Sequence, residues 1–238
     1  MLLRQLATAC VVISLATVAA AQEKADQEQE AGKAVSLFNG QDLTGWVGDT
    51  EYWSVEEGAI TGRTTPENLL SYNTFLVWDG GEPSDFELTL RYRIVGGNSG
   101  VQYRSRVIDQ ERFIVSGYQA DIDSKPNYSG MVYEEKARAF LAERGQRVKI
   151  APDGSKAVEQ IGDKDELQQA INDEAWNDYT IVAEGNHIKH LINGRLMSEL
   201  FDMQSDKAAK SGVIALQLHQ GQEPMTIQFK DIRLRELK

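Results

Sequence analysis

Cysteine is nearly absent from this sequence, because Cys10 is the single one among 238 residues. Cys10 lies in an N-terminal stretch with the features of an export signal, so we expect a mature chain without cysteine. Such a chain forms no disulfide and offers no thiol nucleophile. A disulfide-stabilised fold and catalysis by a cysteine nucleophile are therefore excluded for the mature protein.

Basic residues are also scarce. The chain has 25 Lys and Arg against 36 Asp and Glu, which gives a formal net charge of -11. A nucleic-acid-binding surface must be basic to offset the phosphates, so this balance argues against a nucleic-acid partner. Beyond residues 6–18, no apolar run approaches the roughly 20 residues of a membrane-spanning helix. We expect no membrane span, and the sequence does not determine the oligomeric state.

The first 33 residues are predicted to lie outside the folded domain. A signal peptide is predicted over residues 1–21, because Arg4 precedes an uncharged apolar run that ends in three alanines, the last being Ala21. Residues 22–33 are polar and charged without hydrophobic periodicity, which is typical of a flexible acidic linker. We therefore expect cleavage after Ala21 and a periplasmic or secreted mature protein.

Residues 34–238 are predicted to form one all-β domain. About 200 residues is a size that suits a single domain with a substantial core. The clearest signal is 86–94, where five apolar residues alternate with four polar ones, as in a strand with one buried face. Asn-Gly dipeptides at 39–40 and 193–194 indicate tight turns between such strands.

The segment 134–175 departs from this pattern, and we interpret it as a small α/β insertion. Residues 134–143 have helical propensity before a glycine, residues 152–154 are Pro-Asp-Gly and predict a hairpin, and residues 163–171 predict a short helix begun by Asp. The insertion is either a surface decoration or a lid over a site.

Three strands are expected to present polar side chains on one face. Side chains alternate between the two faces of a strand, so even and odd positions separate. In the strand after Gly100, the set Val101, Tyr103, Ser105 and Val107 is expected to pack, and the set Gln102, Arg104 and Arg106 to face outward. By the same reasoning, Gln119 and Asp121 are expected to face outward from their strand, and Gln217 and His219 from theirs. The alternative is an ordinary solvated sheet face.

Six short motifs occur in order along the domain. They are Ser36-Leu37-Phe38-Asn39-Gly40 with Gly45-Trp46, Gly97-Asn98-Ser99-Gly100-Val101, Gly117-Tyr118, Trp176-Asn177, Asn193-Gly194 and Leu216-Gln217-Leu218-His219. In these motifs the chain resembles the 3-keto-disaccharide hydrolase domain family over about 34–237. The resemblance implies a concanavalin A-like jelly-roll sandwich of two curved antiparallel sheets, with a carbohydrate bound on the concave sheet.

The resemblance also implies an activity, cleavage of the glycosidic bond of 3-keto-glycosides by elimination or hydrolysis. A ketone at C3 acidifies the hydrogen at C2, so a base can remove it while donors stabilise the enolate and the anomeric substituent leaves. The expected protein is therefore a 3-keto-glycoside hydrolase or lyase. The alternatives are a non-catalytic carbohydrate-binding module on the same sandwich, or a structural domain with a solvated polar face.

Three residues are candidates for catalysis. His219 is a candidate for proton transfer, since an ordinary imidazole pKa of about 6.5 suits it; the alternative is a structural histidine at a strand end. Arg104 is a candidate to polarise the ketone. Asp121 is a candidate base, a metal ligand, or the ion-pair partner of Arg104.

Four further residues are candidates for substrate binding: Gln102, Gln119, Gln217 and Tyr133, the last as a wall of the site, a hydroxyl donor or a core aromatic. In the family pattern the position after Gly-Tyr is usually Glu, whereas this chain has Gln119. Asp121 lies two residues further on the same face, a displacement of roughly 6 to 7 Å along a strand. The resemblance therefore supports the fold more firmly than it supports activity.

No cofactor requirement is visible in the sequence, and the identity of any metal is left open. A structural calcium is the one ion considered, with Asp121 and Asp123, or Asp173 and Asp178, as oxygen ligands. Neither pair has the ordered spacing of a calcium loop.

Overall fold

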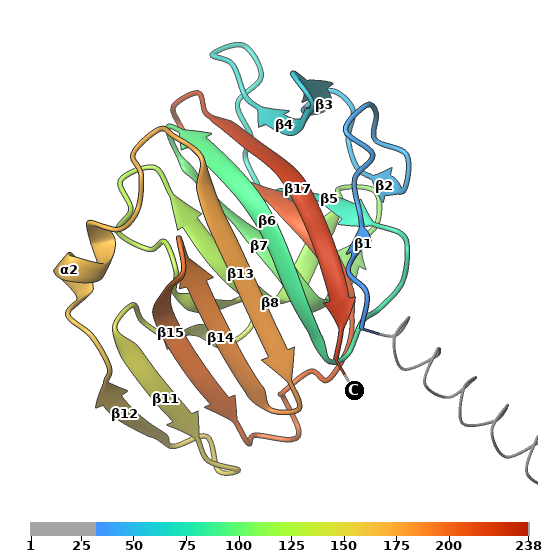
Figure 1. The fold of residues 1–238 in the computed structure, drawn as a ribbon. Helices are drawn as coiled ribbons and strands as arrows, with labels where there is room; N and C mark the ends of the chain where they lie inside the picture. The colour runs from blue at the N-terminus through green and yellow to red at the C-terminus, as the bar shows by residue number, and fades with distance from the viewer. Residues whose placement is uncertain (1–31, 238) are drawn as a thin grey trace, which may run out of the picture.

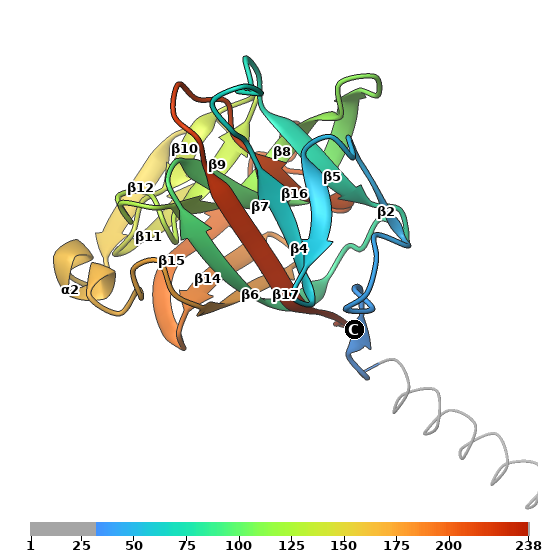
Figure 2. The ribbon, with the colours of Figure 1, turned by 90° about the horizontal axis from the view of Figure 1, so that it is seen from above.

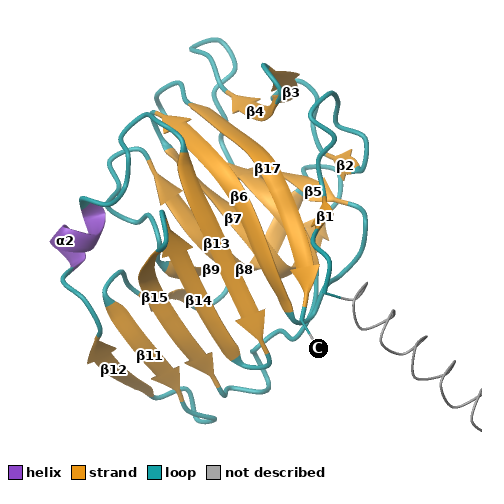
Figure 3. Cartoon of the chain, viewed as in Figure 1, coloured by secondary structure: helices purple, strands orange, loops and turns teal. Residues whose placement is uncertain are grey.

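The computed structural model describes residues 32–237, and strands dominate this range (Figure 3). The predicted signal peptide and residues 22–31 of the predicted linker lie outside the described residues. Among the helices of the described range, none is both long and apolar enough to cross a membrane.

Two sheets form the domain as two stacked layers (Figures 1 and 2). The ten-stranded sheet runs in the order β12 (Lys156–Gln160), β11 (Gln146–Ile150), β15 (Arg195–Asp202), β14 (His187–Ile192), β13 (Asn177–Glu184), β6 (Phe86–Val95), β17 (Thr226–Glu236), β4 (Ala59–Arg63) and β3 (Trp53–Glu56), with β1 (Val35–Ser36) paired to β17. The seven-stranded sheet runs β10 (Ala139–Ala142), β9 (Val132–Glu135), β8 (Ile114–Asp123), β7 (Asn98–Asp109), β16 (Val213–Leu218), β5 (Thr74–Trp78) and β2 (Trp46–Val47).

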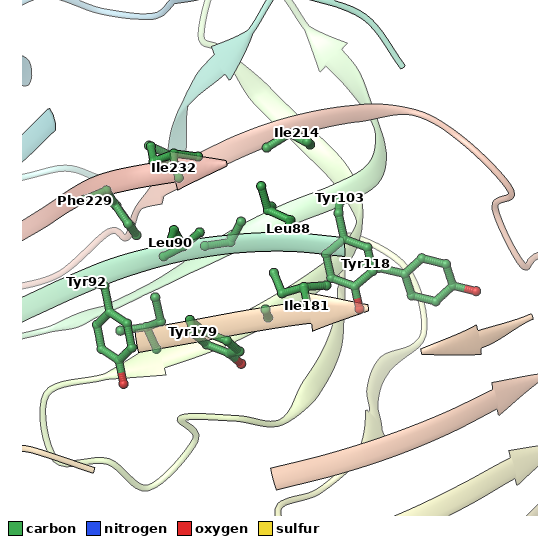
Figure 4. Close-up of a cluster of buried hydrophobic side chains, with 14 of the residues drawn as sticks. Leu88, Leu90, Tyr92, Tyr103, Tyr118, Tyr179, Ile181, Ile214, Phe229 and Ile232 are labelled. Carbon is green, nitrogen blue, oxygen red and sulfur yellow. The ribbon is translucent and has the colours of Figure 1, made fainter. Parts of the chain in front are cut away.

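The core lies between the two sheets, where each contributes its apolar face. The predicted alternation holds along β6, whose residues are alternately buried and half-buried from Phe86 to Ile94. Figure 4 shows part of the resulting cluster, which includes Tyr103 and Tyr118 from the seven-stranded sheet. Their rings stack with centroids 5.8 Å apart. The prediction of an all-β sandwich is confirmed.

The segment 134–175 differs from its prediction in one part. Residues 134–143 are not helical, because they form β9 and β10 around a tight turn in which Lys136 has a positive φ of 56°. The hairpin at 152–154 joins β11 to β12 as predicted. The short helix α2 (Lys164–Gln168) begins after Asp163, whose carboxylate accepts the N–H groups of Asp165 and Glu166. Strand β11 pairs parallel with β15, a local exception to the expected antiparallel sheets.

A β-bulge in β7 interrupts the predicted alternation of that strand. Tyr103 pairs with Tyr118 and Arg106 with Ser116, so Arg104 and Ser105 together lie opposite Gly117. Arg104 takes a positive φ of 46° there. A bulge of this kind shifts every later side chain by one position, so the faces exchange beyond it.

The predicted faces of Arg104, Ser105 and Val107 on β7 are therefore wrong. Ser105 and Val107 were expected to pack between the sheets. Instead, the Ser105 hydroxyl donates to Gln102 Oε1 on the outer face, and Val107 packs against a separate apolar cluster. That cluster contains Phe75, Val77, Val115 and Ala215. It covers one part of the outer face of the seven-stranded sheet and leaves another part open.

Candidate functional site

A pocket of about 490 Å³ lies on the outer face of the seven-stranded sheet. Its lining residues come from β7, β8, β9, β10 and β16 and from the segments next to these strands and to β5. They are Asn73, Asn98, Gln119, Asp121, Tyr128, Tyr133, Glu135, Lys136, Ala137, Phe140, Gln217, His219 and Gln220. Five residues expected from the sequence at the site are in this list.

Three glutamines from neighbouring strands form a hydrogen-bonded row at the floor of the pocket, where Gln119 and Gln217 are lining residues and the fully buried Gln102 is not. Gln102 on β7 and Gln217 on β16 both donate from Nε2 to Gln119 Oε1 on β8, over 2.7 and 2.9 Å. Gln119 in turn donates from Nε2 to Asp121 Oδ1 over 2.6 Å. The predicted juxtaposition of these three strands is confirmed. Because Gln119 Oε1 accepts both of these bonds, the side chain of Gln119 is held in one orientation, with its Nε2 donating to the Asp121 carboxylate.

Gly100 makes room for this arrangement. It lies opposite Asp121 in the pairing of β7 with β8, and a Cβ atom there would lie 2.6 Å from the side chain of Gln119. That separation is well below van der Waals contact, so a larger residue would displace Gln119. The strand was expected to begin after Gly100, whereas Gly100 lies within β7 and makes room for the floor of the pocket.

Asp121 is the carboxylate at this floor, and it is 5% exposed. Burial raises its pKa to about 8, and the nearby carboxylates of Glu135 and Asp123 act in the same direction, while the hydrogen bond from Gln119 opposes them. A carboxyl that titrates near neutral pH is suited to proton transfer, since its two forms interconvert in the working range. The predicted ion pair with Arg104 is wrong.

Arg104 lies elsewhere, although the sequence placed it with Gln102. The bulge turns its guanidinium toward the loops of the ten-stranded sheet. There it donates to the carbonyls of Ser84 and Gly185, each over 2.7 Å, and to Asp85 Oδ1 over 2.8 Å. Its side chain is 1% exposed. Arg104 therefore links the two sheets through hydrogen bonds at one end of the sandwich. It does not line the pocket that contains Asp121.

Glu135 and Asn73 belong to the pocket but were not singled out in the sequence. Asn73 Nδ2 donates to Glu135 Oε1 over 3.2 Å, although three strands separate β5 from β9 in the sheet. The sheet must therefore be hollowed at this face for the two side chains to meet. The alternation of Tyr133 with Glu135 was the available signal, but a helical interpretation of residues 134–143 hid it.

His219 lies at the end of β16, half-buried in the pocket wall. Its Nδ1 is 2.5 Å from the carbonyl oxygen of Gln220, so Nδ1 carries the proton in this bond. The neighbouring Gln220 is tied to Asn73 through a backbone hydrogen bond to the side-chain oxygen. His219 is thus held at the rim opposite β9.

Gln217 carries an unsatisfied acceptor. Its Oε1 is buried and has no hydrogen-bond partner among the described residues, while its Nε2 donates to Gln119. A buried polar atom without a partner costs roughly 1 to 3 kcal/mol, so a ligand donor that reached Gln217 Oε1 would remove this cost. A hydroxyl group is the donor that a carbohydrate would supply.

Aromatic rings form the opposite wall, which we call the aromatic wall and define as Tyr128, Tyr133 and Phe140. Tyr133 and Phe140 face one another across β9 and β10, with ring centroids 5.0 Å apart. Tyr128 stacks on Phe140 at 5.7 Å. Burial raises the pKa of the Tyr133 hydroxyl, and Glu135 and Asp121 raise it further. Tyr133 is therefore a protonated hydroxyl beside two carboxylates.

Metal ligands do not gather in the part of the chain that the structure describes, where no group of three or more His, Cys, Asp or Glu side chains could hold an ion. The Asp123 carboxylate accepts the backbone N–H groups of Lys125 and Asn127. The calcium considered from the sequence stays a prediction.

The raised pKa of Asp121 leads to a prediction about stability. Its folded-state pKa is about 8, against an ordinary value of 3.8. Between these two values the folded protein holds a proton that the unfolded chain has released, so this group lowers the free energy of unfolding as pH rises from about 4 to 8. Asp121→Asn removes the titration. Urea unfolding at pH 5, 7 and 9 should show wild type losing stability relative to the variant, and parallel curves would contradict the assignment.

A family model covers nearly all of the described domain. The family is described as the 3-keto-alpha-glucoside-1,2-lyase-like domain, and its model matches residues 33–235. This chain belongs to that family. The comparison with curated proteins finds no match. Membership agrees with the resemblance in the sequence motifs and establishes a carbohydrate-active, glycosyl hydrolase-like domain.

Solved structures share the fold. A candidate glycosyl hydrolase from Parabacteroides distasonis ATCC 8503 is similar with a TM-score of 0.55 at 20% identity, over 86% of this chain and 100% of that one. Carbohydrate-binding module CBM66 from Bacillus subtilis is similar with a TM-score of 0.52 at 17% identity, over 81% and 96%. The laminarinase catalytic domain from Thermotoga maritima MSB8 gives 0.51 at 11% identity, over 87% and 98%. At these identities the likeness establishes the concanavalin A-like fold.

Proposed function

We propose that this family member is an exported enzyme that cleaves the glycosidic bond of 3-keto-glycosides in the pocket on the seven-stranded sheet. The observation that carries the proposal is Asp121, a buried carboxyl with a pKa of about 8 at the floor, between an aromatic wall and His219. Family membership supplies the class of substrate. The pocket supplies a base, donors and an unsatisfied acceptor.

The proposed reaction is an elimination across C1 and C2. The Asp121 carboxylate takes the C2 proton, which the adjacent C3 ketone acidifies. The C2–H electron pair moves to form the enolate, and then expels the substituent at C1, whose oxygen takes a proton from the Tyr133 hydroxyl. Water adds to C1 where hydrolysis completes the sequence. General acid and base groups each contribute about 10²- to 10⁴-fold to such steps.

The order of the groups across the pocket suits this reaction. Tyr133 on β9, Asp121 on β8 and His219 after β16 follow one another across the sheet. C1, C2 and C3 are likewise consecutive in the sugar ring. A ring bound over the floor would therefore present its leaving oxygen toward Tyr133, its C2 hydrogen toward Asp121 and its ketone toward His219, whose ring would stabilise the enolate oxygen. Gln217 Oε1 would accept a sugar hydroxyl.

The test is incubation of the mature protein, residues 22–238, with 3-keto-glucosides and the matching unoxidised glucosides, following release of the aglycone. We expect release from the 3-keto substrates alone. Asp178→Asn serves as the control, because Asp178 is on the ten-stranded sheet with 71% of its side chain exposed. Release from neither class of substrate would contradict the proposal.

His219→Ala is expected to lower kcat by about 10²-fold while KM changes by only a few-fold, because the group acts on charge that develops in the transition state. Steady-state kinetics with a 3-keto-glucoside measure both constants. An unchanged kcat would remove His219 from the mechanism and return it to the role of a structural histidine at a strand end.

A non-catalytic carbohydrate-binding domain is the second candidate. The observation that favours it is Gln119, which occupies the position where the family pattern has Glu, so that the carboxylate comes from Asp121 instead. A binding domain would hold unoxidised and oxidised sugars without releasing the aglycone. Isothermal titration calorimetry with an unoxidised glucoside, together with the release assay, separates binding from cleavage.

A further inference from the structure

We propose that the aromatic wall is an aglycone subsite that accepts a planar aromatic leaving group, such as a phenyl ring. This inference rests on the proposed function, because it names the substituent at C1. It follows from three observations on the wall: its exposure, its fixed ring contacts and the apolar side chain of Phe140.

The aromatic wall exposes apolar ring surface to water, which is unfavourable unless a ligand covers it. Tyr128 is 46% exposed and Phe140 is 40% exposed, and both line the pocket. Two large exposed rings in mutual contact within a cavity form a surface that gains free energy when a second apolar face covers it. Elsewhere in the pocket the floor is polar, so the wall and the floor differ in the chemistry that they recognise.

The wall is also held in place before any ligand binds. Phe140 meets Tyr133 edge to face at an interplanar angle of 71°, and it stacks on Tyr128 at 29°. Its backbone carbonyl accepts a hydrogen bond from Lys156 Nζ over 2.7 Å, which ties the edge strand β10 to β12. A preformed wall costs little conformational entropy when a ring stacks on it.

The surroundings of Phe140 favour an aryl group over a second sugar. The side chain of Phe140 offers no donor or acceptor, and Ala137 also lines the pocket. The nearby ammonium of Lys136 is 3.9 Å from Glu135 and so faces the carboxylate. A second sugar needs hydrogen bonds around its ring, whereas an aryl group needs only a ring face. Within the wall, Tyr133 is on β9, which pairs with β10 on one side and on the other with β8, the strand of Asp121, where the bond to the leaving group would be cleaved.

The experiment compares phenyl and methyl 3-keto-glucosides of the same anomer. For Phe140→Ala we expect kcat/KM on the phenyl substrate to fall by about 5- to 10-fold, through KM, with less than a 2-fold change on the methyl substrate, since one aromatic stacking contact has about this effect. Tyr128→Ala is expected to show the same selectivity. Phe140→Tyr keeps the ring face and should keep wild-type selectivity.

The matched control is Phe201→Ala, which removes a half-buried ring that stacks on His187 in the ten-stranded sheet, away from the pocket. It should change neither substrate's kcat/KM. Phe140→Leu, which retains apolar volume without a ring, provides a second variant where alanine disturbs folding. Equal losses on both substrates, or no loss on either, would overturn the aglycone subsite.

Direct binding separates this inference from the proposed reaction. Calorimetry with phenyl and methyl glucosides on wild type and on Phe140→Ala requires no turnover. If no substrate is cleaved, yet the phenyl glucoside binds more tightly and Phe140→Ala abolishes the difference, the reaction is wrong and the aryl subsite stands. If wild type binds both glucosides equally and cleaves both equally, the subsite is wrong whatever the reaction.

Discussion

Replacing Asp121 by Asn is expected to lower kcat on a 3-keto-glucoside by about 10²- to 10⁴-fold, because the amide cannot accept the C2 proton. The change is nearly isosteric, so the amide can still lie beside Gln119 and the floor keeps its shape. KM is expected to stay within a few-fold of wild type. The measurement is steady-state kinetics across pH.

The pH profile provides the second part of this test. Burial places the pKa of Asp121 at about 8, so the ionised form that acts as base accumulates as pH rises through that value. For wild type, kcat/KM should therefore rise between about pH 6 and 9, and the residual activity of Asp121→Asn should lack this rise. A variant with wild-type kcat, or with the same pH profile, would show that another group removes the proton.

Replacing Arg104 by Ala is expected to destabilise the fold by about 3 kcal/mol, because it removes a buried side chain that donates to two backbone carbonyls and to the Asp85 carboxylate. The side chain of Arg104 is 1% exposed, and it bonds Ser84, Asp85 and Gly185. Urea unfolding measures the loss. The folded fraction of the variant should retain kcat within about 2-fold of wild type, since no reacting atom lies near the guanidinium.

This result would show that Arg104 has a structural role, unlike Asp121, although the sequence analysis named both as candidates for catalysis. A large loss of kcat with unchanged stability would return Arg104 to the active site. Arg147→Ala is a useful control for the loss of an arginine, because Arg147 forms ion pairs with Glu199 and Glu159 at the far part of the ten-stranded sheet. It should lose less stability, since its side chain is 33% exposed and water replaces part of the interaction.

Alternation along single strands made much of the site predictable. Gln119 and Asp121, or Gln217 and His219, share a face because they are two residues apart, and this needs no knowledge of the rest of the chain. Sequence patterns also distinguished the packing residues of β6. The same logic failed at Arg104, because a bulge shifts the register and nothing in the local sequence marks its position.

The sequence by itself determined an acidic, all-β domain and the polar rows on β7, β8 and β16, up to the bulge, since these depend on composition and on the two-residue period. Its motifs added the resemblance to a carbohydrate-active family. Only the tertiary structure decided that Asn73 meets Glu135 and that Phe140 joins Tyr133 at the pocket. The hydrogen bond of Asn73 spans 62 positions in the chain. It forms because two distant strands enter one hollowed sheet, and pairing and curvature are properties of the assembled sheet and not of either segment.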